Sequence, residues 1–275
     1  MFLRACAIVL TLVPAGLAAE RAAARSGDVM HLVDLMGLPE VVEVMHEEGL
    51  DYGAALADEM LPRGASGQWP GTVARIYDPA RMEETLREGF AASMSGTDPA
   101  PLIAFFESPG ARRLVSLEIS ARRAMMDEDV EEAAREDYLA RARDPDDRFL
   151  LVREFVETND LVEANVTGAL NSNFAFYRGL ADAGALEMTE DEMLAEVWAQ
   201  EEETRTDSRE WLMGFLLLAY DPVAPELLED YVALSQTEAG RAMNRALFAG
   251  FDPMYADISY ALGLALAREM RATDL

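Results

Sequence analysis

The stretch DPAPLIAFFESPGARRLVSLEISARRAM, residues 98–125, decides the fold class. Its apolar residues recur three and four positions apart, at Leu102, Phe105 and Phe106 and again at Leu114, Leu117, Ala121 and Met125. This spacing is the period of α-helices that bury one face. Strand-like alternation is nearly absent from the rest of the chain, so the sequence predicts an all-α protein.

Asp-Pro dipeptides mark predicted helix starts, because Asp is a frequent N-cap and Pro is best tolerated in the first helical turn. The dipeptide occurs at Asp78-Pro79, Asp98-Pro99, Asp144-Pro145, Asp221-Pro222 and Asp252-Pro253. Capping-box spacing predicts two further starts, at Thr189 with Glu192 and at Ser235 with Glu238.

These starts and the apolar period divide the chain into two similar series of helices. In the first half we expect helices near residues 28–36, 39–61, 70–77, 79–94, 99–107 and 109–143. In the second half we expect them near 145–157, 160–182, 189–205, 207–220, 222–234 and 237–272, the last open to a kink at Asp252-Pro253. About six helices followed by about six predict two tandem, similar helical bundles packed together.

Residue matches between the halves indicate a duplication. Leu32-Val33 aligns with Leu151-Val152 at an offset of about 120 residues, and Arg112 aligns with Arg241 at an offset of about 129. We therefore expect a signal peptide at residues 1–24, a first helical repeat at 25–143 and a second at 144–275.

The N-terminus has the layout of a secretory signal peptide. A basic start, Met1–Arg4, precedes an apolar run at residues 5–17 that is too short to cross a bilayer comfortably. Small residues place cleavage near Ala18 or Ala24, which removes Cys6, the only cysteine. We expect a periplasmic or secreted protein, without a transmembrane segment in the mature chain, that relies on its core and not on disulfides.

Strong acidity narrows the classes of partner. The chain has 51 Asp and Glu residues against 23 basic ones, for a net charge of −28, and every basic residue is Arg. The missing lysines exclude Schiff-base lysines, GK[ST] phosphate loops and Ser/Lys dyads. A negative surface repels nucleic acid and attracts cations and basic proteins, so we expect envelope proteins, basic ones among them, as partners.

The motif FFESPGAR, residues 105–112, resembles that of a bacterial exported family. Its members carry an aromatic, Ser/Thr-Pro and Gly pattern followed by a basic residue, between two helices; the family is labelled domain of unknown function 2059. A looser match, LSQTEAGR at residues 234–241, indicates a tandem duplicate. The resemblance implies an exported helical bundle, and it carries no established activity and no catalytic residue. Ser108 and Thr237 are expected to cap the helices that follow them.

Two acid-x-x-His pairs, Asp28 with His31 and Glu43 with His46, are the candidate metal ligands. A carboxylate and a His at i, i+3 on two helices is how helical bundles hold di-metal sites. The alternative is that both histidines are structural, since the second half forms without them.

Glu107 is the candidate catalytic residue. Glu107-Ser108 in a helical context is similar to the Glu-Ser pair of lytic transglycosylases, in which a buried Glu acts as general acid. Burial among Leu102, Phe105 and Phe106 would favour the protonated form. Gly-x-Ser-x-Gly, His-Glu-x-x-His and glycine-rich phosphate patterns are absent from the sequence.

The sequence therefore favours a non-enzymatic interaction or scaffold module of the cell envelope, without a cofactor. The alternatives are a cell-wall hydrolase that uses carboxylates and a carrier of an apolar ligand between the two bundles. The 15 methionines and the three tryptophans, Trp69, Trp198 and Trp211, suit either a core or an adaptable apolar groove.

Overall fold

The computed structural model describes residues 26–61 and 63–273, and the predicted signal peptide lies outside them. Over these residues the chain forms helices and no strand, which confirms the all-α class. A helical segment covers residues 26–35. It is followed by α2 (Leu38–Met60), α3 (Trp69–Ile76), α4 (Pro79–Ser93), α5 (Ala100–Phe106), α6 (Pro109–Ala124), α7 (Glu128–Arg143), α8 (Asp147–Thr158), α9 (Leu161–Asp182), α10 (Glu190–Ala199), α11 (Glu201–Tyr220), α12 (Pro225–Ser235) and α13 (Glu238–Thr273).

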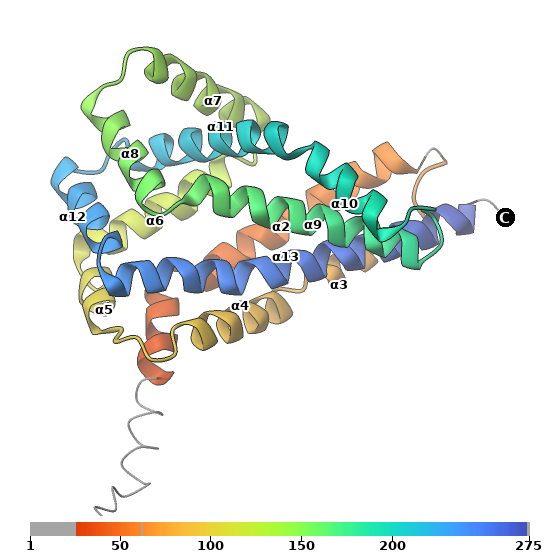
Figure 1. The fold of residues 1–275 in the computed structure, drawn as a ribbon, viewed down its shortest axis with the longest axis horizontal. Coiled ribbons are helices and arrows are strands. Elements are labelled where there is room, and N and C mark those ends of the chain that lie inside the picture. The colour runs from red at the N-terminus through yellow and green to blue at the C-terminus, as the bar shows by residue number, and fades with distance from the viewer. Residues whose placement is uncertain (1–25, 62, 274–275) are drawn as a thin grey trace, which may run out of the picture.

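The 36-residue helix α13 extends along most of the molecule and packs against both α9 and α4. Figure 1 shows α9 running between α11 and α13, and α9 contacts both of these helices. The second half of the chain therefore brings three long helices together, and one of them, α13, also joins the second half to α4 of the first.

Glycines permit the close approach of α13 to its neighbours. A Cβ placed on Gly89 of α4 would lie 2.3 Å from the backbone oxygen of Ala249. Pro253 has no N–H, so it leaves this same oxygen without its usual helical donor. Helix α13 nevertheless runs through Asp252-Pro253, as the helix expected near 237–272 does, and the dipeptide starts no helix of its own.

One continuous hydrophobic core joins the two halves. It includes fully buried side chains from both, among them Leu32, Phe90 and Leu114 from the first half and Tyr220, Leu228 and Leu266 from the second. The halves share this core instead of enclosing two separate ones.

A left-handed residue precedes the corresponding long helix of each half. Gly37, with φ of 65°, stands before α2, and Asp160, with φ of 51°, stands before α9. A non-glycine residue is uncommon in this region. The same backbone turn thus precedes both helices, and the duplication and the division into two repeats stay predictions.

Local capping signals are confirmed where the side chain reaches the next turn. Asp78 accepts from the backbone N–H of Arg81 at 2.9 Å, and Ser108 accepts from that of Ala111 at 3.1 Å. The predicted capping box that begins at Thr189 is complete. Thr237 accepts from the N–H of Gly240 at 3.0 Å, as the motif led us to expect.

The breaks between helices differ from the prediction at two places. The stretch 109–143 is two helices, because Asp127 accepts from the N–H of Asp129 at 3.0 Å and begins α7. The break expected between residues 205 and 207 lies instead at Gln200, which separates α10 from α11.

Three predicted starts are also displaced. Asp221-Pro222 lies in a turn, and α12 begins later, at Pro225. Asp146, not Asp144, caps α8. Ser235 is buried and donates to the backbone oxygen of Tyr231 at 3.0 Å, so it caps no helix.

Candidate functional site

The structure places Glu107 at the surface. Its side chain is 55% exposed, and Oε1 lies 3.3 Å from Nε2 of His31. The neighbouring apolar residues turn the other way: Phe106 is buried in the core, and Phe105 stacks on Tyr231 with ring centroids 5.3 Å apart. The burial on which the acid role was predicted is therefore absent.

The candidate metal ligands have separate partners. His46 donates from Nδ1 to the backbone oxygen of Tyr77 at 2.7 Å, whereas His31 faces Glu107. Asp28 and Glu43 are exposed. Over residues 26–61 and 63–273, no three His, Cys, Asp or Glu side chains are grouped to hold a metal ion. The structure does not bring the predicted ligands together.

A groove of about 520 Å³ lies between α9, α11 and α13, and we call it the aromatic groove. Its lining comes from α9 (Leu161, Ala164, Asn165, Gly168, Ala169, Ser172 and Asn173), α11 (Trp211, Leu212 and Phe215), α13 (Asn244, Leu247, Phe248, Phe251, Asp252 and Tyr255) and α6 (Arg122).

Small and aromatic side chains together create this groove. Helix α9 contributes small residues, among them Gly168 and Ala169. On α11 the rings of Trp211 and Phe215 stack at 5.3 Å, and α13 contributes the neighbouring rings of Phe251 and Tyr255. All four aromatic side chains are half-buried. Partly exposed aromatic surface gathered in one hollow is typical of ligand-binding sites.

A charge pair stands beside the groove. Arg122 of α6 donates to both carboxylate oxygens of Glu48 on α2, from Nε and Nη2 at 2.8 Å each. Nη2 also lies 3.4 Å from the hydroxyl of Tyr255. The side chains of Arg122 and Glu48 are only 22% and 31% exposed. The positive charge that lines the groove is thus already neutralised within the protein.

Asp252 lines the groove without such a partner. A Cβ on Gly168 would lie 3.1 Å from Oδ1 of Asp252, so the absence of a side chain at Gly168 leaves room for the carboxylate. Asp252 is half-buried, and among the residues that the structure describes it has neither a hydrogen bond nor an ion pair through its side chain. Burial raises the pKa of its carboxyl above the ordinary value.

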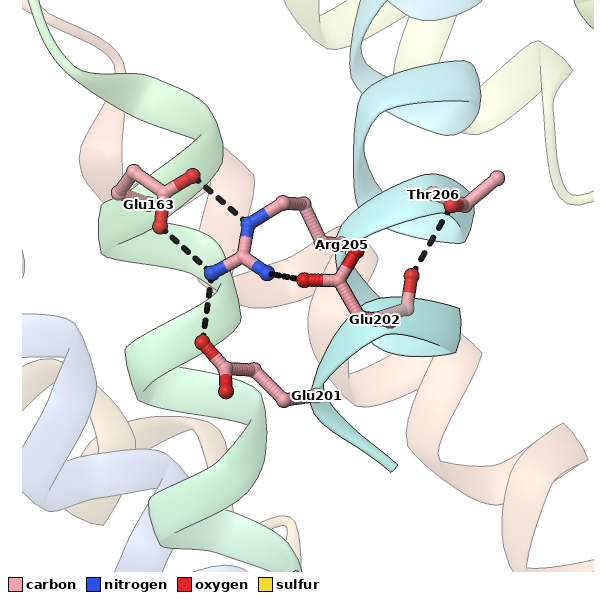
Figure 2. A network of polar contacts seen from close by, with 5 residues as sticks. All are labelled: Glu163, Glu201, Glu202, Arg205 and Thr206. Carbon is pink, nitrogen blue, oxygen red and sulfur yellow. Dashed lines mark hydrogen bonds and ion pairs between the residues drawn. The ribbon is translucent and has the colours of Figure 1, made fainter. Parts of the chain in front are cut away.

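A charged network fixes α9 against α11 next to the groove. Figure 2 shows Arg205 of α11 donating to both oxygens of Glu163 on α9, at 2.9 and 3.0 Å, and to Glu201 and Glu202 at 2.7 and 2.6 Å. The hydrogen bond from Arg205 lowers the pKa of the Glu163 carboxyl. Because Glu163 precedes Ala164, the network joins the groove-lining turn of α9 to α11.

A smaller hollow of about 280 Å³ also borders α9, where α7, α8 and α11 meet it. Arg153 and Arg209 line it together with three acidic side chains, and Arg153 lies 3.7 Å from Glu157. Since charges of both signs are mixed there, this hollow does not select for one ligand charge. The aromatic groove is the better candidate site.

Among the groove residues, sequence reasoning named Trp211, with its role left open between a core and a groove, and Asp252, as part of an expected helix start or kink. The spacing of Trp211 and Phe215 is an i, i+4 stripe, as is that of Phe251 and Tyr255. Such a stripe has the same pattern whether it faces a core or a groove. The run of small residues in α9 opposite these rings is the one signal that favours a groove.

The fold and the groove define a class, an all-helical protein with an aromatic-lined groove. Residues 80–136 match a family model described as an uncharacterized protein conserved in bacteria (DUF2059). The match contains the motif at 105–112 and confirms the resemblance. It extends from α4 into α7, about a fifth of the chain, and Arg122 is the only groove-lining residue inside it.

No curated protein and no solved structure matches the chain. Within residues 26–61 and 63–273, none of the helices combines the length and the apolar character that crossing a membrane requires.

Proposed function

We propose that this protein is an exported, non-enzymatic binding protein of the bacterial cell envelope and that the aromatic groove holds an apolar small molecule. The observation that carries the proposal is the gathering of half-buried aromatic side chains around a hollow of about 520 Å³. Small-molecule sites commonly have about 300–1,000 Å³ and an apolar lining with a few polar groups.

Ligand binding in this groove has a clear driving force. Each aromatic side chain that a ligand covers loses contact with water, and full burial of such a side chain contributes about 1.5–3 kcal/mol. Trp211, Phe215 and Phe251 are each half-buried without a ligand, so part of this free energy is still available. This supports an apolar carrier over a scaffold without a ligand site, with the groove lined mainly by the second half and not placed between two bundles.

Hydrolysis has less support from the groove. Glycosidases use two carboxyl groups on either side of the scissile bond. Asp252 is the only carboxylate among the residues that line the groove, and the nearby Glu48 is held by Arg122. Glu107 is exposed and lies outside the groove.

The envelope location rests on the sequence, on the basic start and the apolar run of residues 1–17. Mass spectrometry of the mature chain from the periplasm tests it. We expect an N-terminus just after Ala18 or Ala24, and recovery of the full-length chain in the cytoplasm would contradict export.

Binding of the neutral dye N-phenyl-1-naphthylamine tests the groove. Its fluorescence should rise on addition of the mature protein. Ala169→Trp places a large ring in the groove and should weaken binding by about tenfold or more. Asn171→Trp is the matched control, because Asn171 is exposed on the same helix and does not line the groove. Equal binding by the two variants, both folded by circular dichroism, would contradict the proposal.

A further inference from the structure

Of the two charged side chains that line the aromatic groove, the positive one has a partner among the described residues of the protein and the negative one does not. Arg122 supplies the only positive side chain of the lining, and Glu48 neutralises it through two contacts of 2.8 Å. Asp252 supplies the only negative one, and no described residue pairs with it. The three charges together leave one net negative charge at the groove.

An unpaired carboxylate beside apolar surface is costly when a ligand displaces its water. A neutral ligand that covers Asp252 removes water without replacing it. An anionic ligand adds repulsion, because the guanidinium of Arg122 is already engaged. A cationic group restores the lost interaction with a charge-assisted hydrogen bond.

We propose that the ligand of the aromatic groove is a cationic amphiphile, an apolar chain or ring system with one ammonium group that pairs with the carboxylate of Asp252. The inference rests on the proposed function, since it names the chemical class of the molecule bound there. The protein's net charge of −28 favours the same sign of ligand, because the long-range field concentrates cations near the surface.

The size of the hollow favours a small amphiphile over a segment of another protein. A stable protein interface buries about 800 Å² on each partner. A hollow of about 520 Å³ instead matches a single small ligand, and its aromatic rings suit contact with an alkyl chain or ring. The ammonium then lies at Asp252 and the apolar part against Trp211, Phe215 and Phe251.

Three probes with one alkyl chain and different head groups test the charge preference. Dodecylammonium, dodecanol and dodecanoate are each titrated, below the concentration at which they form micelles, against mature protein loaded with N-phenyl-1-naphthylamine. We expect dodecylammonium to displace the dye at about tenfold lower concentration than dodecanol, and dodecanoate to be the weakest.

Variants of Asp252 separate the local pair from the acidic surface. Asp252→Asn should abolish the preference for dodecylammonium and leave the affinity for dodecanol nearly unchanged. Asp252→Glu, which keeps the charge, should retain part of the preference. Asp257→Asn is the matched control, because Asp257 is exposed on the same helix and lies outside the groove.

The outcomes distinguish a wrong ligand class from a wrong proposed function of the groove. If dodecanol or dodecanoate displaces the dye as well as dodecylammonium does, the groove binds apolar molecules but the inferred ligand class is wrong. If the preference for dodecylammonium persists in Asp252→Asn, the preference comes from the acidic surface of the protein. The inferred pairing of the ammonium group with Asp252 is then wrong. If no probe competes and Ala169→Trp binds the dye like the wild type, the proposed function itself fails.

Discussion

The hydroxyl of Tyr220, at the end of α11, donates a hydrogen bond of 2.5 Å to Oε1 of Glu118 on α6. Tyr220 is fully buried, and burial raises the pKa of the Glu118 carboxyl to about 7, although the hydrogen bond from Tyr220 lowers it. The contact joins the two halves of the chain through a carboxyl group that sequence reasoning did not single out.

Replacement of Glu118 should change how stability depends on pH. The carboxyl has an ordinary pKa of 4.5 and a pKa of about 7 in the folded protein, so the folded state retains a proton that the unfolded chain releases. The proton therefore contributes its full stabilisation of the folded state below about pH 4.5. This contribution decreases as pH rises and is lost once pH has passed about 7. The loss is on the order of 3 kcal/mol, at about 1.4 kcal/mol per pKa unit.

Urea unfolding of wild type and Glu118→Gln from about pH 4.5 to 8 measures this loss. The variant, which stays neutral, should gain stability relative to the wild type as pH rises. Tyr220→Phe removes the hydrogen bond that lowers the pKa, so its loss of stability should occur at higher pH than that of the wild type. A difference between wild type and Glu118→Gln that stays constant with pH would contradict the assignment.

Gly89→Ala should destabilise the crossing of α4 and α13. The new Cβ would lie 2.3 Å from the backbone oxygen of Ala249, and a backbone atom cannot turn aside as a flexible side chain does. Overpacking of this kind costs about 1–3 kcal/mol, which thermal and urea unfolding will detect.

Gly71→Ala is the matched control for that substitution. Gly71 is exposed in α3, and the nearest atom to its Cβ would be the end of the Arg75 side chain at 3.7 Å. Because Ala favours helix over Gly by about 1 kcal/mol, Gly71→Ala should be neutral or stabilising. Similar losses in both variants would mean that the crossing of α4 and α13 is not as tight as described.

Two adjacent arginines should differ in their contribution to stability. Arg122 contacts Glu48 at 2.8 Å with both side chains less than a third exposed, whereas Arg123 contacts Glu47 at 3.2 Å with side chains 52% and 47% exposed. Arg122→Gln leaves a half-buried carboxylate unpaired and should cost about 1–3 kcal/mol. Arg123→Gln should cost less than about 1 kcal/mol.

A double-mutant cycle with Glu48→Gln checks that the loss comes from the pair. The coupling energy between positions 48 and 122 should account for most of the cost of Arg122→Gln. A coupling near zero would assign the effect to the packing of the arginine stem. The result also bears on the ligand proposal, because Arg122 is unavailable to an anion only while Glu48 holds it.

Local features of the sequence predicted more of the fold than of the site. The caps at Asp78, Ser108 and Thr189 are confirmed because each involves a side chain and a backbone N–H within one turn. Asp221-Pro222 and Asp252-Pro253 have the same local pattern, yet one lies in a turn and the other inside α13. Whether an Asp-Pro dipeptide starts a helix, lies in a turn or lies inside a helix therefore depends on the packing of the surrounding helices.

The aromatic groove depends on tertiary structure in the same way. The sequence of α11 does not tell an apolar residue of the core from one of the groove, yet Leu217 is buried in the core and Trp211 lines the groove. Which face is left open depends on how α9, α11 and α13 pack, and no short motif encodes that packing. Glu107 illustrates the converse, since apolar neighbours in sequence did not bury its carboxylate.

Binding of the cationic probe should weaken in acid. The pKa of Asp252 is raised because burial disfavours its charged form, so its carboxylate takes up a proton at higher pH than an ordinary aspartate does. The neutral acid no longer pairs with an ammonium group. The other charged groups at this part of the groove are Arg122 and Glu48, which neutralise each other, and Tyr255 supplies a hydroxyl.

Displacement titrations at several pH values measure this dependence. The affinity for dodecylammonium should fall as pH decreases, whereas that for dodecanol should stay level while the protein remains folded. In Asp252→Asn the two probes should show the same, flat dependence. If the wild type binds dodecylammonium equally well on both sides of the titration of Asp252, the ammonium does not pair with this carboxylate. A parallel loss of both probes would instead reflect a change in the groove itself, which circular dichroism at each pH will reveal.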